Sequence, residues 1–190
     1  MIKNFLISTL VFGLILICSC DTNFYFGDIY GTFVDLRDNQ TYNTVCIGNQ
    51  VWMTDNLRYD TKDNNSMIYN NITINDTNNF IFRNGRLYNR LAFKKAIPVG
   101  WRIPTGEDIV TLYKNLNVSY ENAVSDLKIL NFTKSGSGYS NGIDIKNSWF
   151  YNISGMYWLQ DDNLLVISDR VSSDFNNSDI TYFSIKLIKE

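Results

Sequence analysis

The sequence predicts one α+β domain, with strands toward both ends of the chain and helices between them. Period-two apolar runs near the N-terminus and near the C-terminus predict the strands. Between them, an apolar stripe at i, i+3, i+4 and i+7 over residues 109–116 predicts an amphipathic helix. Strands, then helices, then strands favour an antiparallel sheet in which the first and last strands are neighbours.

Composition agrees with a folded domain and excludes several chemistries. The 190 residues are 45% hydrophobic and 15% aromatic, which excludes a disordered polymer. The net charge is -2 and the basic and acidic residues are intermixed, so nucleic acid is not an expected partner. Histidine is absent, which excludes a Ser-His-Asp triad, a Cys-His pair and a histidine-bound zinc. We predict no cofactor and no metal site.

The first strands are predicted by alternating residues and turn signals. Residues 31–35 and 41–47 alternate apolar and polar side chains, and a turn-like stretch over residues 37–40 separates them. This pattern indicates a hairpin. A tight turn at Gly48 and Asn49 then leads into a third strand over residues 50–53.

Two helices are predicted in the middle of the chain, and a third is weaker. The first covers residues 88–96 and is stopped by Pro98. Thr105 has the placement of an N-cap, with Asp108 three positions later, so a second helix begins after it. Residues 119–130 are the third candidate.

The remaining segments are predicted as a loop and as further strands. Residues 60–79 are rich in Asn, Asp and Thr, which indicates an extended surface loop. Its oxygens at Asp60, Asp63, Asn64 and Asn65 are of the kind that binds calcium, but their spacing matches no EF-hand loop. Strands are predicted at residues 149–151, 156–159, 164–168 and 181–188. In the last of these, alternation predicts one buried and one exposed face.

Residues 1–19 have the layout of a lipoprotein signal peptide. An apolar stretch over residues 5–17 is too short to span a bilayer comfortably. Residues 17–20, which are Ile-Cys-Ser-Cys, resemble a bacterial lipobox. The resemblance implies attachment of a diacylglycerol to the Cys20 thiol, cleavage before Cys20, and N-acylation with a fatty acid such as palmitate. The alternatives are an ordinary cleaved signal peptide and an uncleaved anchor helix.

Lipidation at Cys20 defines the expected location of the protein. Two or three acyl chains hold a protein stably on a bilayer, whereas one chain is marginal. We therefore expect a membrane partner through the lipid anchor, with residues 20–30 as a tether in the bacterial cell envelope. The outer membrane or the cell surface is favoured over the inner membrane.

Several runs in a fixed order resemble one domain family. Residues 31–42 fit Gly-Thr-Phe-x-Asp-x-Arg-Asp-x-x-x-Tyr, and residues 47–53 fit Ile-Gly-x-Gln-x-Trp-Met. Further matches are Asn56, Leu57, Gly85, Leu87, Tyr88 and the Gly-Trp-Arg-Ile-Pro-Thr run at residues 100–105. These runs identify residues 31–190 as a member of the domain family first described as a major paralogous family of Fibrobacter succinogenes. The family is common in bacterial surface lipoproteins.

The resemblance implies a fold but no activity. The family is similar to the C-type-lectin-like fold, which also contains the formylglycine-generating enzymes. It implies a mixed α+β domain with an antiparallel sheet, two to three short helices and long loops. Fold does not supply function.

Two departures from the family pattern occur together. Ile97 stands where the family commonly has a cysteine, and Leu187 stands at a second common cysteine position in the last strand. We expect these residues to meet as an apolar pair that replaces a disulfide with burial. Cys46 is then expected to be a lone thiol that packs as a small hydrophobe.

Two groups of residues are candidate site residues. The structural group combines residues of the family motif with the two departures described above: Trp52, Trp101, Arg102, Pro104, Thr105, Ile97 and Leu187. We expect the two tryptophans to pack in the core and Arg102 to hold loop carbonyls or a carboxylate together. The candidate ligand-binding group lies where C-type lectins have a Trp-Asn-Asp strand: Trp149, Tyr151, Tyr157, Trp158, Asp161 and Asp162. The lectin Glu-Pro-Asn loop is absent, so calcium-dependent sugar binding is not expected.

Three classes of function remain. We favour an envelope-anchored, non-catalytic binding or interaction module that contacts glycan or protein through exposed aromatics and loop amides. The alternative is a structural subunit of a surface assembly. An enzyme related to the formylglycine generators is less favoured, because those enzymes need active-site cysteines and the mature chain offers only Cys20 and Cys46.

Overall fold

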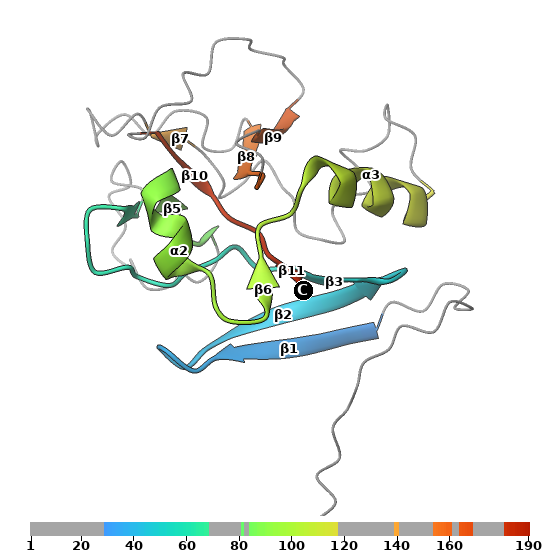
Figure 1. The fold of residues 1–190 in the computed structure, drawn as a ribbon, viewed down its shortest axis with the longest axis horizontal. Helices are drawn as coiled ribbons and strands as arrows, with labels where there is room; N and C mark the ends of the chain where they lie inside the picture. The colour runs from blue at the N-terminus through green and yellow to red at the C-terminus, as the bar shows by residue number, and fades with distance from the viewer. Residues whose placement is uncertain are drawn as a thin grey trace, which may run out of the picture.

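The described residues form two sheets that lie one above the other, with the helices α2 (Phe93–Ala96) and α3 (Gly106–Asn115) on opposite sides (Figure 1). The computed structural model of the chain describes residues 29–68, 81, 84–117, 139–140, 154–160, 164–168 and 181–190. Residues 1–28, the predicted strand at residues 149–151 and the predicted helix at residues 119–130 lie outside them. The mostly antiparallel strands and short helices make the described part an α+β fold, as the sequence predicts.

The lower sheet joins the two ends of the domain. Its order is β1-β2-β3-β11-β6, and every neighbouring pair is antiparallel. The strands are β1 (Ile29–Asp35), β2 (Gln40–Ile47), β3 (Gln50–Met53), β11 (Ile188–Lys189) and β6 (Trp101–Arg102). The predicted hairpin of β1 and β2 is confirmed, and so is the shared sheet, because Ile188 in β11 pairs with Trp52 in β3.

The upper sheet is built from short strands of the middle and end of the chain. Its order is β4-β5-β10-β8-β9, and β7 also pairs with β10. The strands are β4 (Ser66–Met67), β5 (Leu87–Tyr88), β10 (Tyr182–Ser184), β8 (Ser154–Trp158), β9 (Leu164–Ser168) and β7 (Tyr139–Ser140). The pairing of β10 with β8 is parallel, and the other pairings are antiparallel.

Polar side chains cap the 3-10 turn that precedes α2 and the start of α3, whereas α2 itself has no side-chain cap. The predicted helix over residues 88–96 is shorter: Tyr88 belongs to β5, a 3-10 turn η1 (Arg90–Ala92) follows, and α2 covers Phe93–Ala96. The side chain of Asn89 accepts a hydrogen bond from the Ala92 amide, which explains the later start. The predicted second helix is confirmed as α3 (Gly106–Asn115), which begins after Thr105.

The C-terminal segment connects the two sheets. It leaves the upper sheet after β10 and enters the lower sheet at β11 (Figure 1). Between them, the Leu57 amide donates to the Ile185 carbonyl at 2.9 Å, and the Met53 amide donates to the Leu187 carbonyl at 2.9 Å. All residues from 181 to 188 are buried, so the prediction of a half-exposed strand is wrong. A segment that crosses between two layers has neighbours on both faces.

The core lies between the sheets and is rich in aromatic residues. Trp158 is fully buried, its indole N–H donates to the Tyr88 carbonyl at 2.7 Å, and its ring meets Phe183 edge-on with centroids 4.8 Å apart. Leu187 belongs to the same apolar cluster, and Ile97 packs against that cluster. Ile97 and Leu187 therefore contribute to one apolar core.

Lys186 is a charged residue inside this segment. Its side chain is 1% exposed, and its Nζ donates to the Thr54 carbonyl at 2.6 Å. Burial lowers the pKa of the ammonium to about 7, although the charge of Asp55 opposes that change. Since the free lysine pKa is near 10.5, the unfolded chain binds this proton more tightly than the folded one.

This difference predicts how stability depends on pH. Between pH 7 and pH 10, unfolding takes up a proton at Lys186, so the free energy of unfolding should rise with pH, by up to about 1.4 kcal/mol per pH unit. Below pH 7 both states carry the proton and this contribution is flat. Lys186→Met should remove the rise, as measured by urea unfolding at several pH values.

Lys189→Met is the matched control, because Lys189 is exposed on β11. This variant should keep the wild-type dependence on pH. An identical dependence in Lys186→Met and in wild type would contradict the assignment.

Candidate functional site

The Gly100–Thr105 run is a structural junction between β6 and α3. Gly100 has a φ of 79°, a left-handed conformation that glycine adopts without strain. Arg102 forms two hydrogen bonds with the Asp108 carboxylate, at 2.6 and 2.9 Å, and Thr105 and Asp108 cap each other reciprocally. Pro104 is buried, and its carbonyl accepts from the Gln160 amide at 2.9 Å.

The two family tryptophans lie in the core. Trp101 is 6% exposed and its ring centroid lies 5.0 Å from that of Phe33 in β1. Trp52 is fully buried, and its indole N–H donates to Gln50 at 3.2 Å. The Gln50 amide in turn donates to the Asp108 carbonyl at 3.1 Å, which ties β3 to the first turn of α3. These contacts hold the secondary-structure elements in place, so the roles of Trp52 and Trp101 in this fold are structural.

The candidate ligand-binding residues predicted from the sequence do not form an exposed platform where the structure describes them. Tyr157 and Trp158 are 1% and 0% exposed, so neither presents a ring face to solvent. The reason is that β8 lies inside the upper sheet, between β10 and β9. Trp149, Tyr151, Asp161 and Asp162 lie outside the described residues, as does Cys20.

Cys46 differs from its expectation. It is half-buried on β2, and its sulfur is part of a disulfide. The expectation of a lone thiol is therefore wrong. Cys18 and Cys20, the other cysteines of the chain, lie outside the described residues.

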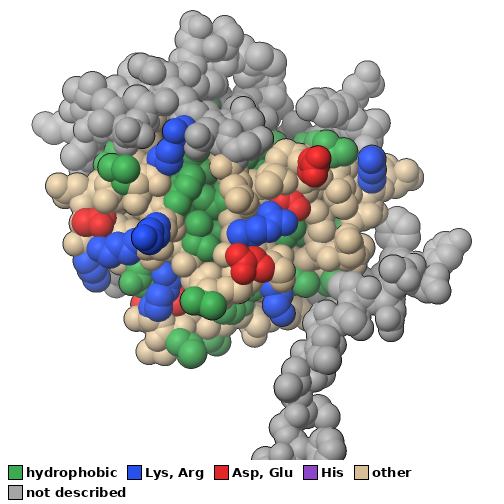
Figure 2. Space-filling model, in the orientation of Figure 1, with side chains coloured by type: hydrophobic (Ala, Val, Ile, Leu, Met, Phe, Trp, Pro, Cys, Tyr) green, Lys and Arg blue, Asp and Glu red, His purple; other side chains and the backbone are tan. Residues whose placement is uncertain are grey.

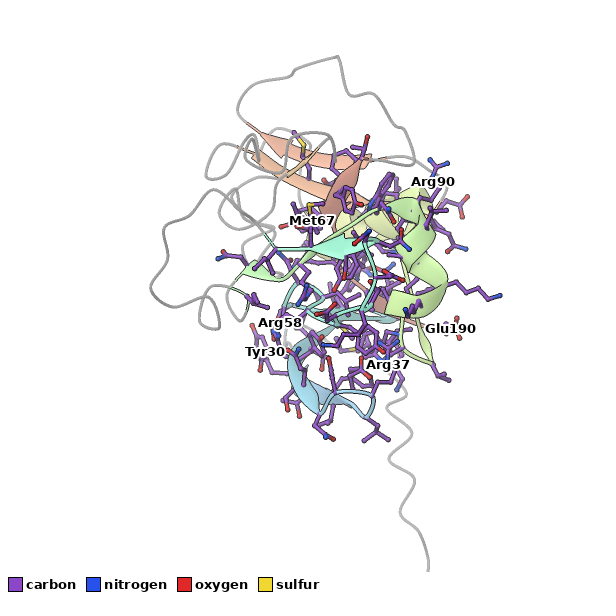
Figure 3. The ribbon with its side chains drawn as sticks, turned by 90° about the vertical axis from the view of Figure 1, so that its left-hand side faces the viewer. Tyr30, Arg37, Arg58, Met67, Arg90 and Glu190 are labelled. Atoms are coloured by element: carbon purple, nitrogen blue, oxygen red, sulfur yellow. The ribbon has the colours of Figure 1, made fainter. Side chains whose placement is uncertain are left out.

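A polar cleft of about 420 Å³ is the candidate site, and the sequence did not predict it. It lies where the β1–β2 turn meets the segment after β3 and the segment before β5. Four cations and two carboxylates line it: Arg37, Arg58, Lys62, Arg86, Asp38 and Asp60. The other lining residues are Gln40, Tyr59 and Ile81. Figure 3 labels Arg37 and Arg58, which lie close to the β1–β2 hairpin.

Arg37 is fully used by the protein itself. Its Nε and Nη2 donate to the buried carboxylate of Asp35, and its guanidinium also donates to the carbonyls of Lys95, Ala96 and Ile97. These carbonyls are at the C-terminal end of α2, where no helical partner exists for them. All five N–H groups of the guanidinium therefore have acceptors. Arg37 fixes the β1–β2 turn against α2 and is not an open donor.

Arg58 is also held by the protein. Its side chain is 2% exposed, and it donates to the Gln40 side chain at 2.7 Å and to the Thr41 carbonyl at 2.5 Å. Its guanidinium carbon lies 4.3 Å from the centre of the Tyr42 ring. Arg58 thus forms a wall of the cleft.

Gly85 places Arg86 at the cleft. Gly85 is buried with a φ of 76°, and an added Cβ would lie 2.6 Å from Asn56 Cβ and 2.8 Å from the Leu57 carbonyl oxygen. Only glycine fits there. The next amide, that of Arg86, donates to the Leu57 carbonyl at 2.9 Å, so Arg86 lies beside the segment that carries residues 58–62.

Lys62 and Arg86 share one carboxylate. Arg86 Nη2 lies 2.8 Å and Lys62 Nζ lies 3.4 Å from the same oxygen, Oδ2 of Asp60. Burial raises the pKa of Asp60, but the Lys62 amide and the Arg86 charge outweigh it and hold the pKa below its usual value. Lys62 is 80% exposed at its side chain and Arg86 is 16% exposed. The shared oxygen therefore brings two cations within reach of one small ligand group.

The calcium-type oxygens of this region are occupied by protein donors. Asp63 accepts from the Thr61 hydroxyl, the Asn65 amide and the Lys95 ammonium, and these bonds lower its pKa to about 2. Among the described residues, no group of three or more Asp, Glu, Cys or His side chains could hold a metal ion.

The protein is an α+β domain with a polar cleft that is large enough for a small ligand. Comparison with known families identifies the family of this domain. The chain belongs to the Fibrobacter succinogenes major domain family, whose family model matches residues 45–142. No curated protein and no solved structure matches the chain. The family assignment carries no activity with it, because a fold or family does not define a function.

The capping contacts of α3 give a prediction for acid stability. Burial raises the pKa of Asp108, but the bonds from Arg102 and Thr105 outweigh it and lower the pKa to about 2. The carboxylate therefore stabilises the fold above pH 4, and this contribution is lost as pH falls from 4 toward 2. Asp108→Asn should lower the free energy of unfolding at pH 7 by about 2 kcal/mol.

The measurement is urea unfolding from pH 7 to pH 2. The gap between wild type and Asp108→Asn should close as pH falls below 4. Glu107→Gln is the control, because Glu107 is exposed in the same helical turn. A constant gap at all pH values would contradict the role of the charge.

Proposed function

We propose that this protein is an envelope-anchored, non-catalytic binding module whose ligand occupies the polar cleft. The observation that carries the proposal is the pair of cations at Asp60, which line a cleft of about 420 Å³ and keep N–H groups without acceptors among the described residues. Ligand pockets in proteins begin at about 300 Å³, so the cleft has room for a small ligand. The ligand classes that we expect are glycan and envelope protein.

The anchoring part of the proposal rests on the N-terminal sequence. Cys20 ends a lipobox-like run, and a diacylglycerol thioether with an N-acyl chain holds a protein stably on a membrane. No helix in the described part of the chain is long and apolar enough to cross a membrane. We place the protein at the outer membrane or the cell surface.

Two other functions are alternatives to the binding module. A structural subunit of a surface assembly would self-associate or bind envelope proteins through faces other than the cleft. An enzyme related to the formylglycine generators is less favoured, because those enzymes need active-site cysteines and the mature chain offers only Cys20 and Cys46.

The finer fold assignment, a relative of the C-type-lectin-like fold, is also a proposal. It is supported by the meeting of β1, β2 and β3 with β11 in one antiparallel sheet and by the long segments between short elements. An experimental structure whose strand order cannot be superposed on lectin-like domains would refute it.

Lipidation predicts a clear result for one substitution. Cys20→Ser removes the thiol that receives the diacylglycerol, so labelling with radioactive palmitate should be abolished. The protein should also move from the membrane fraction to the soluble fraction. Cys18→Ser is the matched control and should keep both properties. Unchanged labelling of Cys20→Ser would refute lipidation at this residue.

The binding role is tested with the full-length protein in detergent on a glycan array, with and without calcium. We expect hits that are independent of calcium and that disappear in Arg86→Gln. Hits that persist in this variant would move the site away from the cleft. An absence of hits together with self-association in sedimentation experiments would favour the structural subunit.

A further inference from the structure

The donors and acceptors of the cleft are unequally occupied. Asp60 accepts from the Lys62 amide at 2.9 Å, the Lys62 ammonium at 3.4 Å, Arg86 at 2.8 Å and the Ser66 hydroxyl at 3.5 Å. A carboxylate has about four acceptor sites, so Asp60 has no capacity left for a ligand. The groups near Asp60 that can still form hydrogen bonds with a ligand must therefore be donors.

Arg86 and Lys62 supply these donors. A guanidinium carries five N–H groups and an ammonium three. Within the described residues, the Asp60 carboxylate is the one side-chain acceptor of both cations. Arg86 donates to it through Nη2 alone, and Lys62 donates to it through Nζ. The remaining N–H groups are available at the cleft, where a group rich in acceptor oxygens fits them best. A carboxylate matches the planar guanidinium in particular, because it accepts two parallel hydrogen bonds.

The other cations do not compete for the ligand. Arg37 is neutralised by Asp35 at 2.6 Å, and all its N–H groups are used. Arg58 is 2% exposed and has Asp55 within 3.8 Å. Lys62 and Arg86, in contrast, share one carboxylate between two positive charges. An incoming anion would restore the balance at this end of the cleft.

The rest of the cleft suits hydroxyl groups. Asp38 accepts from the amide and the side chain of Gln40 and keeps lone pairs for further donors. The Tyr59 hydroxyl has no partner among the described residues, and one face of its ring is covered by Arg37 at 3.8 Å. The volume of about 420 Å³ exceeds what a carboxylate alone needs. This part of the cleft therefore has both the room and the polar partners for a body that carries hydroxyl groups.

We propose that the cleft binds an acidic saccharide of one or two sugar rings, whose carboxylate is held by Arg86 and Lys62. The hydroxyls face Asp38 and Tyr59. This inference rests on the proposed binding function and names the ligand class of that same site.

The test uses digalacturonate and its neutral counterpart, galactobiose, with the full-length protein in detergent and calorimetry as the readout. Digalacturonate should bind and galactobiose should not. Arg86→Gln and Lys62→Gln should each weaken digalacturonate binding about tenfold or more, because each removes a charge-assisted hydrogen bond. Lys62 is 80% exposed, so its substitution should not affect folding.

Lys94→Gln is the charge-matched control, because Lys94 is exposed on α2 and does not line the cleft. Figure 2 shows other basic side chains gathered around the part of this face where α2 lies in Figure 1. If their charge alone attracted the ligand, Lys94→Gln would weaken binding as much as Lys62→Gln does, and the proposal would be overturned.

Other outcomes separate this inference from the function on which it rests. Equal binding of galactobiose, lost in Arg86→Gln, would overturn the acidic class and keep the binding module. Binding of an acidic peptide but not of digalacturonate, again lost in Arg86→Gln, would do the same. No binding of any probe, with no array hits, would overturn both.

Discussion

The path of the C-terminal segment through both sheets is the constraint on which the rest of the structure depends. Ile185 and Leu187 have no strand assignment, yet their carbonyls accept from the Leu57 and Met53 amides. The segment therefore fixes the backbone that follows β3. Arg58 comes directly after Leu57, and the further cleft residues Tyr59, Asp60 and Lys62 follow it. A site near the surface thus takes its geometry from a segment in which all residues from 181 to 188 are buried.

The cleft shows how similar side chains take different roles through their partners. Arg37 is about one-third exposed but has an acceptor for each N–H group, so its role is to hold the β1–β2 turn on the end of α2. Arg86 is less exposed, yet it keeps open N–H groups because Gly85 places it beside a carboxylate that Lys62 already shares. Exposure alone therefore does not identify a ligand-binding cation. The count of donors against acceptors does.

Local patterns in the sequence predicted the elements whose causes are local. The hairpin of β1 and β2 and the capped start of α3 were predicted, because alternation and a Thr-x-x-Asp box act within a few residues. The strand over residues 181–188 was misjudged, since alternation cannot reveal that a second sheet covers the polar side. Burial of Trp158 was missed for the same reason. The cleft joins three segments separated by up to about fifty positions, and no local pattern contains such a site.

The buried lysine of the C-terminal segment also constrains how that segment pairs. A guanidinium would bring five N–H groups and would remain charged, whereas an ammonium can lose its proton. In a site where the Thr54 carbonyl lies 2.6 Å from Nζ, the lysine is the less demanding residue to bury. A shift of the segment by one residue would place Ile185 or Leu187 at this carbonyl and leave Lys186 against the apolar cluster. The cost of burying the ammonium therefore also fixes the register from which the cleft is built.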